Sequence, residues 1–201
     1  MALWRPLDID DVEGVVRVAN VVHTQLPERD IVFAERARLF PEGCLVLVEE
    51  TQVRGYAISH PIRHRKPPAL DSLLGEIAPE ADQFYIHDVC ILPELRGRGH
   101  ALDAINKLLA IAERYPTTCL VSVYGSVLFW ARFGFRSPAA VDNALSDKIR
   151  GYGDNATYLE RCNDIEATSR LSRRHTGSRE ATVLDKSGLG SSQLVSSSKQ
   201  L

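Results

Sequence analysis

A short basic turn at residues 96–101 has the composition of an anion-binding site. It consists of Arg96, Gly97, Arg98, Gly99, His100 and Ala101. The preceding segment, FYIHDVCIL at 84–92, is rich in β-branched and aromatic residues, which predicts a buried strand. The following segment, ALDAINKLLAIAERY at 101–115, carries apolar residues at helical spacing. Such a turn presents unpaired backbone N–H groups at the positive end of the helix dipole, so we expect it to bind phosphate.

The spacing of the glycines narrows the choice of phosphate-binding motif. The chain contains no G-x-x-x-x-G-K-[ST] string, which excludes a P-loop. Leu102 occupies the third glycine position of the dinucleotide fingerprint G-x-G-x-x-G, which disfavours that motif. The remaining pattern, Arg-x-x-Gly-x-Ala after a strand and a proline, closely resembles the pyrophosphate-binding motif of the GNAT superfamily of N-acetyltransferases, [Gln/Arg]-x-x-Gly-x-[Gly/Ala].

Further segments extend this resemblance over about residues 2–162. TTCLVSVYGSVLFWARFGF, from residue 117, is similar to the family's fifth strand, the next helix and the Gly-Phe pair that opens its sixth strand. GYGDNATYLER, from residue 151, resembles the last strand. His60-Pro61, Tyr-Ile-His-Asp at 85–88 and Phe-Trp before Gly-Phe are similar to a little-characterised bacterial and fungal branch. The resemblance implies an α/β (α+β) fold with a mixed, mostly antiparallel twisted sheet of six or seven strands, helices on both faces, and a cleft where strands four and five splay apart.

The resemblance also implies a cosubstrate, acetyl-CoA. Backbone groups of strand four would bind the pantetheine arm, and the Ile91 N–H would polarise the thioester carbonyl. The pyrophosphate would rest on the amides of residues 98–101, with Arg96 lining the same turn. The expected cofactor-binding residues are Val89, Cys90, Ile91, Arg96, Gly97, Arg98, Gly99, His100, Ala101 and Ser126.

Strand four also carries the candidate catalytic residues. An amine acceptor must lose a proton, and histidine titrates nearest neutral pH, so His87 is the expected general base. Two-residue alternation puts Tyr85 on the face of His87 and Asp88 on the other face unless a bulge intervenes. The alternatives for His87 are a ligand-positioning role and a structural role in which Asp88 caps a nearby loop. His60 is a second candidate on the acceptor side.

The residue at the position of the family's usual general acid differs in this chain. Many members place a tyrosine on the helix after strand five, where this chain has Trp130. An indole N–H cannot yield a proton near neutral pH. Three possibilities remain: Tyr124 or water protonates the thiolate, no acid is needed, or catalysis has been lost. Trp130 itself is expected to be a core aromatic residue.

The rest of the chain predicts one domain followed by a polar tail. The expected elements before strand four are strands at 3–8, 44–50 and 53–60 and helices at 12–23 and 27–40. Asp10 or Asp11 is available to cap helix 12–23. The long loop at 61–82 enters strand four directly, so it is either a substrate-side wall or a solvated basic loop. We expect an acyltransferase domain at 1–162 and a disordered Ser-rich tail at 163–201.

Composition limits the partners and the compartment. A net charge of −2 disfavours nucleic acid, and no apolar run is long enough to span a bilayer. The N-terminus does not resemble a signal or transit peptide, so cytoplasm is expected, with the nucleus open to a protein of this size. Four dispersed cysteines without a C-x-x-C pair predict free buried thiols and no metal site.

The leading functional hypothesis is an acetyl-CoA-dependent N-acetyltransferase. Its acceptor would be a small-molecule amine or a protein amine, and the protein would be a monomer or a homodimer. A non-catalytic acyl-CoA sensor or scaffold is the main alternative, which Trp130 favours. A nucleotide-binding regulatory domain is a third possibility. The acceptor and the length of the acyl chain are not encoded in any motif.

Overall fold

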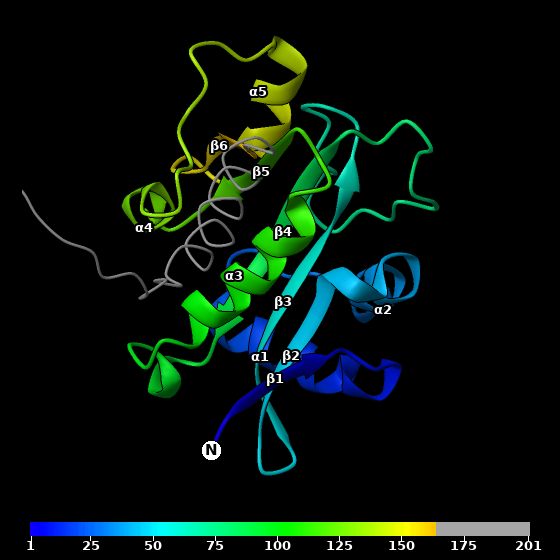
Figure 1. The fold of residues 1–201 in the computed structure, drawn as a ribbon, viewed down its shortest axis with the longest axis vertical. Helices are drawn as coiled ribbons and strands as arrows, with labels where there is room; N and C mark the ends of the chain where they lie inside the picture. The colour runs from blue at the N-terminus through cyan, green and yellow to red at the C-terminus, as the bar shows by residue number, and fades with distance from the viewer. Residues whose placement is uncertain (164–201) are drawn as a thin grey trace, which may run out of the picture. The chain divides into compact units, whose positions relative to one another are not determined.

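A computed structural model describes residues 1–163 of the protein. Six strands form one sheet in the order β1-β2-β3-β4-β5-β6 (Figure 1). The strands are β1 (Leu3–Pro6), β2 (Cys44–Glu49), β3 (Gln52–Ile62), β4 (Gln83–Ile91), β5 (Thr117–Ser122) and β6 (Thr157–Cys162). Neighbouring strands are antiparallel except β4 and β5, which are parallel. This confirms the expected mixed, mostly antiparallel sheet, with six strands.

Helices cover both faces of the sheet, as expected. They are α1 (Val12–Val22), α2 (Asp30–Leu39), α3 (His100–Ala112), α4 (Val127–Ala131) and α5 (Asn143–Arg150). Helices α1 and α2 bury Val15 and Phe33 against one face of the central strands. Helix α3 buries Ile105 and Leu108 against the other face, next to Phe84 of β4. Both faces of β4 are therefore covered, which explains why six of its nine residues are apolar.

A β-bulge changes the direction of the side chains on β4. The pairing register with β3 shifts so that Ile58 lies opposite Asp88 and Ser59 lies opposite Ile86, which leaves His87 without a partner residue on β3. A bulge interrupts the alternation of side chains along a strand. Tyr85 and His87 share one face, and Asp88 joins them on the side of α1 instead of facing α3. The bulge anticipated as an exception is therefore present.

Strands β4 and β5 separate partway along their length. Their register runs from Gln83 opposite Thr117 to Ile86 opposite Leu120 and goes no further. Beyond this point β4 continues to Ile91, where its only partner strand within residues 1–163 is β3, on its other side. The edge of β4 that faces β5 is thus open from residue 87 onward, as the resemblance implied.

Several expectations need correction. The Gly-Phe pair does not open a strand: Phe135 is buried in the core and Arg136 forms a single bridge with Glu160. Helix α5 was not expected. Asp11 is the N-cap residue of α1, as expected, but its side chain makes no capping bond to that helix; Asp8 caps the preceding 3-10 turn, where it accepts a bond from the amide of Asp10. Residues 164–201, which make up nearly all of the expected disordered tail, lie outside the described residues.

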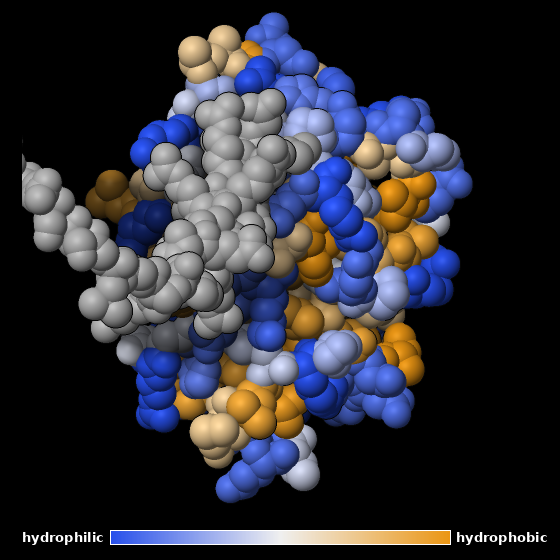
Figure 2. Space-filling view, viewed as in Figure 1, coloured by the Kyte–Doolittle hydropathy of each residue, from blue (hydrophilic) through white to orange (hydrophobic). Residues whose placement is uncertain are grey.

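The surface and the helices carry two further observations. On the face drawn in Figure 2, hydrophilic side chains cover much of the visible described surface, with smaller hydrophobic groups between them. Among residues 1–163, no helix is both long and apolar enough to cross a membrane.

Candidate functional site

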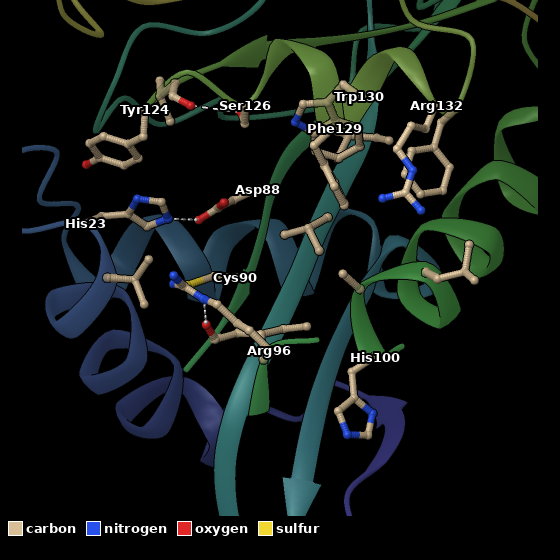
Figure 3. Close-up of a pocket in the computed structure, with 18 of the residues that line it drawn as sticks. His23, Asp88, Cys90, Arg96, His100, Tyr124, Ser126, Phe129, Trp130 and Arg132 are labelled. Atoms are coloured by element: carbon tan, nitrogen blue, oxygen red, sulfur yellow. Dashed lines mark hydrogen bonds and ion pairs between the residues drawn. The ribbon is translucent and has the colours of Figure 1, made fainter. Parts of the chain in front are cut away.

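A cavity of about 650 Å³ occupies the opening between β4 and β5 (Figure 3). The start of α3, the segment around α4 and the end of α1 complete its walls. The expected site residues that line it are His87, Asp88, Val89, Cys90, Ile91, Arg96, Gly97, Gly99, His100, Ala101 and Ser126. Tyr85 and Arg98 do not line it. Tyr85 is fully buried beside His87, so it does not contact a ligand in this cavity directly, and its catalytic role stays a prediction.

The glycine turn at the entrance is shaped by backbone conformation. Gly97 and Gly99 have φ angles of +75° and +88°, a region that favours glycine. A Cβ at either position would meet no protein atom within 4 Å, so the conformation and not crowding within the protein requires glycine. Gly99 is the N-cap of α3, and its carbonyl accepts the first helical bond from the Asp103 amide at 3.1 Å. The amides of the first turn are left without intrahelical acceptors, which suits an anion.

Two further contacts hold this turn in place. The Trp4 indole donates to the carbonyl of His100 at 2.9 Å. The Arg96 guanidinium donates from Nε to the carbonyl of Ile91, also at 2.9 Å, and lines the cavity. Arg96 therefore links the glycine turn to the end of β4 and lines the cavity between them.

His87 is paired with a carboxylate that lies far from it in the sequence. Its Nε2 is 2.9 Å from Oε2 of Glu28, in the segment between α1 and α2. The His87 and Glu28 side chains are only 2% and 9% exposed. Burial alone would raise the pKa of Glu28, but His87 and the Asp71 amide lower it below its ordinary value. Nδ1 of His87 is buried and has no hydrogen-bond partner within residues 1–163.

The loop between β3 and β4 is tied to this pair. The Asp71 amide donates to the second oxygen of Glu28 at 3.2 Å, and the Asp71 carboxylate pairs with Arg29 at 2.7 Å. A few residues earlier in the loop, the carbonyls of Pro67 and Pro68 accept bonds from Lys148 and Tyr152. The loop therefore packs against the segments around α2 and α5, but none of its residues lines the cavity, and its role as a substrate-side wall stays a prediction.

A second acid–histidine pair lies on the cavity wall. Nε2 of His23, which follows the last residue of α1, forms an ion pair at 2.9 Å with Oδ2 of Asp88 (Figure 3). The Tyr56 hydroxyl donates to the same oxygen at 2.5 Å. The His23 and Asp88 side chains are 15% and 19% exposed, more than those of His87 and Glu28. Tyr124 stacks on His23 with ring centroids 5.6 Å apart and a tilt of 16°.

In this second pair, each partner stabilises the charged form of the other. Burial alone would lower the pKa of His23, but the charge and contact of Asp88 raise it above 6.5. Burial alone would raise the pKa of Asp88, but His23 and Tyr56 lower it below 3.8. Burial and the neighbouring Asp88 hold the pKa of Tyr56 well above 10. An ionised carboxylate and an imidazolium are therefore the stable forms over the mildly acidic range.

Sequence reasoning missed His23, Glu28 and Tyr56. No local signal marks them, because each meets its partner only when β4 is placed beside α1 and β3. His60, the second histidine candidate, is fully buried and does not line the cavity, and burial holds its pKa well below 6.5. It cannot contact a ligand there directly.

One group of side chains raises the question of a metal. Ligand atoms of His23, Asp88 and Cys90 lie within 4.8 Å of one another. Asp88 is already bound by His23 and Tyr56, and burial raises the pKa of the Cys90 thiol far above its ordinary value. These contacts favour a hydrogen-bonded cluster, and the absence of a metal stays a prediction.

Trp130 occupies the position at which the family pattern has tyrosine. Its side chain is 8% exposed and packs edge to face on Phe135 at 5.5 Å. It belongs to the core between α3 and β4 and also reaches the cavity wall. The expected core role is thus confirmed.

An open edge of β4, a glycine turn at the start of α3 and a cavity between two parallel strands are the features that the resemblance to the GNAT superfamily implied. The sequence matches the model of the acetyltransferase (GNAT) family over residues 12–135, more than half of the chain. The chain belongs to this family. No curated protein shows significant sequence similarity to it.

Solved structures share the fold at low sequence identity. The loading GNATL domain of CurA from Lyngbya majuscula has a TM-score of 0.68 and 12% identity, covering 81% of this chain and 98% of that one. Ard1 from Thermoplasma volcanium has a TM-score of 0.59 and 17% identity, covering 80% and 97%. Arabidopsis thaliana Naa50, in complex with the bisubstrate analogue CoA-Ac-MVNAL, has a TM-score of 0.57 and 13% identity, covering 79% and 96%.

Proposed function

We propose that this protein transfers an acetyl group from acetyl-CoA to an amine by direct attack. The observation that carries the proposal is the cavity itself, which joins an anion-binding turn to two acid–histidine pairs along the open edge of β4. A thioester is already activated, so such a site needs only to align the reactants, accept a proton and stabilise the oxyanion.

The chain offers a group for each part of acetyl-CoA. The pyrophosphate rests on the amides of residues 98–101, with Arg96 beside them. The pantetheine arm lies along Val89, Cys90 and Ile91, where β4 has no partner strand, and the Ile91 N–H polarises the thioester carbonyl. Ser126, on the opposite wall, contacts the same arm.

His87 is the proposed general base. Glu28 holds Nε2, which selects the tautomer with a proton on that nitrogen and leaves the lone pair of Nδ1 free to accept a proton. Because the imidazole is only 2% exposed, the proton of the amine reaches it through water. Tyr85 packs beside it, and Asp88 binds His23 on the cavity wall.

The acceptor is proposed to be a small-molecule or protein amine in the cytoplasm. All four cysteines are free, and three of them are buried, which supports a reducing compartment. The deep burial of His87 and the tryptophan at position 130 favour a second candidate, a non-catalytic acyl-CoA sensor.

Two assays separate these functions. A thermal-shift comparison of acetyl-CoA with ATP and NAD tests the cofactor, and we expect only acetyl-CoA to raise the melting temperature strongly. Coenzyme A release with a panel of small amines and peptide N-termini then tests catalysis. Binding without release for any amine would favour the sensor, and stronger stabilisation by ATP or NAD would refute both.

A further inference from the structure

Acetyl transfer from coenzyme A leaves a thiolate that must gain a proton, and this inference rests on the proposed function. Helix α4 supplies no acid, because the side chains of Val127–Ala131 are apolar apart from the indole N–H of Trp130. That N–H does not ionise near neutral pH. The acid must therefore come from another wall of the cavity.

The other proton donors on the cavity wall are poor candidates. Burial and the neighbouring Asp88 raise the pKa of both the Cys90 thiol and the Tyr124 hydroxyl, so each gives up its proton less readily than it ordinarily would. The Ser126 hydroxyl already donates to the carbonyl of Val123 at 2.8 Å. His100 lies beside the phosphate-binding turn, across the cavity from Asp88 (Figure 3).

His23 differs from these groups in its geometry. Its Nε2 faces Asp88, and the ligand atoms of His23, Asp88 and Cys90 lie within 4.8 Å of one another, which places the imidazole over the open part of β4. Both ring nitrogens are buried without a hydrogen-bond partner within the described chain, although Nε2 makes the ion pair with Asp88 and Nδ1 makes no such contact. A donor without an acceptor is costly in a buried site, and a ligand that accepts from it would relieve that cost.

We propose that His23, held by Asp88, is the catalytic acid that delivers a proton to the coenzyme A sulfur. Tyr124, which stacks on the imidazole, is itself 55% exposed and has a φ of +53°, in the region that favours glycine. Tyr124 covers one face of the imidazole, whereas the Nδ1–H lies in the ring plane, so the sulfur approaches the edge of the ring. Asp88 keeps the imidazole protonated until the thiolate forms, because its charge raises the pKa of His23.

The two proton transfers of the reaction are carried out by different histidines, His87 as the base and His23 as the acid. The amine nitrogen forms a bond to the acetyl carbon, and its excess proton passes through water to Nδ1 of His87. The carbon–sulfur bond then breaks with its electron pair on sulfur, and Nδ1 of His23 gives its proton to that pair. The products are the amide and the coenzyme A thiol. His87 afterwards releases a proton to solvent and His23 takes one up.

Several charged or titratable groups surround His23, and each bears on its protonation. They are Asp88, Cys90 and His87 from β4, Tyr56 from β3, Glu28 from the segment after α1, Arg96 from the segment after β4, and Tyr124 from the turn after β5. Asp88 and Glu28 favour the imidazolium, whereas Arg96 opposes it.

The pKa of the bound coenzyme A thiol tests the contact between His23 and the sulfur without any turnover. Ultraviolet absorbance of the thiolate, measured against desulfo-CoA, gives the pKa of the bound coenzyme A thiol. An opposite charge within contact distance lowers a thiol pKa by about 1–3 units, so we expect such a drop in the wild type and its loss in His23→Gln. Val21→Gln, at an exposed position near the same helix end, is the matched control and should behave as the wild type.

Two further readouts complete the test. The pKa of the His23 ring in the wild type, measured by NMR titration, should be higher with bound coenzyme A than with bound desulfo-CoA. This measurement does not depend on the folding of a variant. In turnover, His23→Gln should lower kcat by about 10²–10⁴-fold with little change in KM for acetyl-CoA. Equal thiol pKa values in wild type and variant would overturn the proposal even if an amine is acetylated. A lowered thiol pKa without any turnover would instead uphold the His23–sulfur contact and refute the N-acetyltransferase.

Discussion

Replacing Gly99 by aspartate tests the anion site most directly. Gly99 begins α3 with a φ of +88° and sits beside the amides that we assign to the pyrophosphate. A carboxylate at this position repels the pyrophosphate and also strains the backbone. Gly99→Asn is the matched control, because asparagine has nearly the same shape, tolerates the left-handed region about as well and carries no charge.

The magnitude follows from the charge alone. The left-handed conformation costs either variant about 1–2 kcal/mol, so the difference between them isolates the carboxylate. Two like charges about 4 Å apart repel by about 1 kcal/mol in bulk water and about 4 kcal/mol at an effective dielectric constant of 20. Every 1.4 kcal/mol changes affinity about tenfold, and the turn is exposed, so we expect Gly99→Asp to bind acetyl-CoA about 10- to 100-fold more weakly than Gly99→Asn.

Isothermal titration of acetyl-CoA into both variants measures this difference. It should shrink as ionic strength rises, because salt screens exposed charges. Equal affinities of the two variants at low salt would refute the assignment of the pyrophosphate to this turn. A large loss in both variants would show that conformation, and not charge, governs binding.

Three other perturbations probe the rest of the site. His87→Ala should lower kcat about 10²–10⁴-fold with little change in acetyl-CoA affinity, and a twofold loss in steady-state kinetics would assign it a structural role. Asp88→Asn should lower the free energy of unfolding mainly between pH 3.8 and 6.5, the ordinary pKa values of aspartate and histidine. The contribution of Asp88, whose folded pKa is lowered, is lost as pH falls, and that of His23, whose folded pKa is raised, is lost as pH rises. Urea unfolding across pH measures this window, and a difference independent of pH would contradict the ion pair. Gly55→Ala places a Cβ 2.7 Å from the carbonyl of Cys90, so unfolding should become easier by about 1–3 kcal/mol, and an unchanged midpoint would contradict the close β3–β4 contact.

Local patterns were sufficient for most of the fold. The apolar run at 84–92 forms β4 at Gln83–Ile91, and the helical spacing at 101–115 forms α3 at His100–Ala112. These predictions succeed because periodicity of 2 or 3.6 reflects which side chains each element buries. The pattern failed after Trp130, where Phe135 is buried as a side chain without joining the sheet.

The candidate site was only partly readable from the sequence. Most residues of the glycine turn and the end of β4 line the cavity, because they are contiguous in the chain and their motif encodes a backbone conformation. Arg98 and Tyr85 do not line the cavity. The direction of a side chain at a turn, and its depth within a sheet, depend on the other elements that pack against it. The superfamily was recognisable, whereas the bacterial and fungal branch stays a prediction.

The sequence by itself determined most of the elements, their order and the glycine turn, since each depends on residues close together in the chain. The tertiary structure alone decided the partners of the two histidines. A bulge turns both His87 and Asp88 toward one face of β4, and α1 and the segment after it bring His23 and Glu28 against them. Charge pairing acts only over a few ångströms, so the protonation of this site depends on packing between elements that no local pattern specifies.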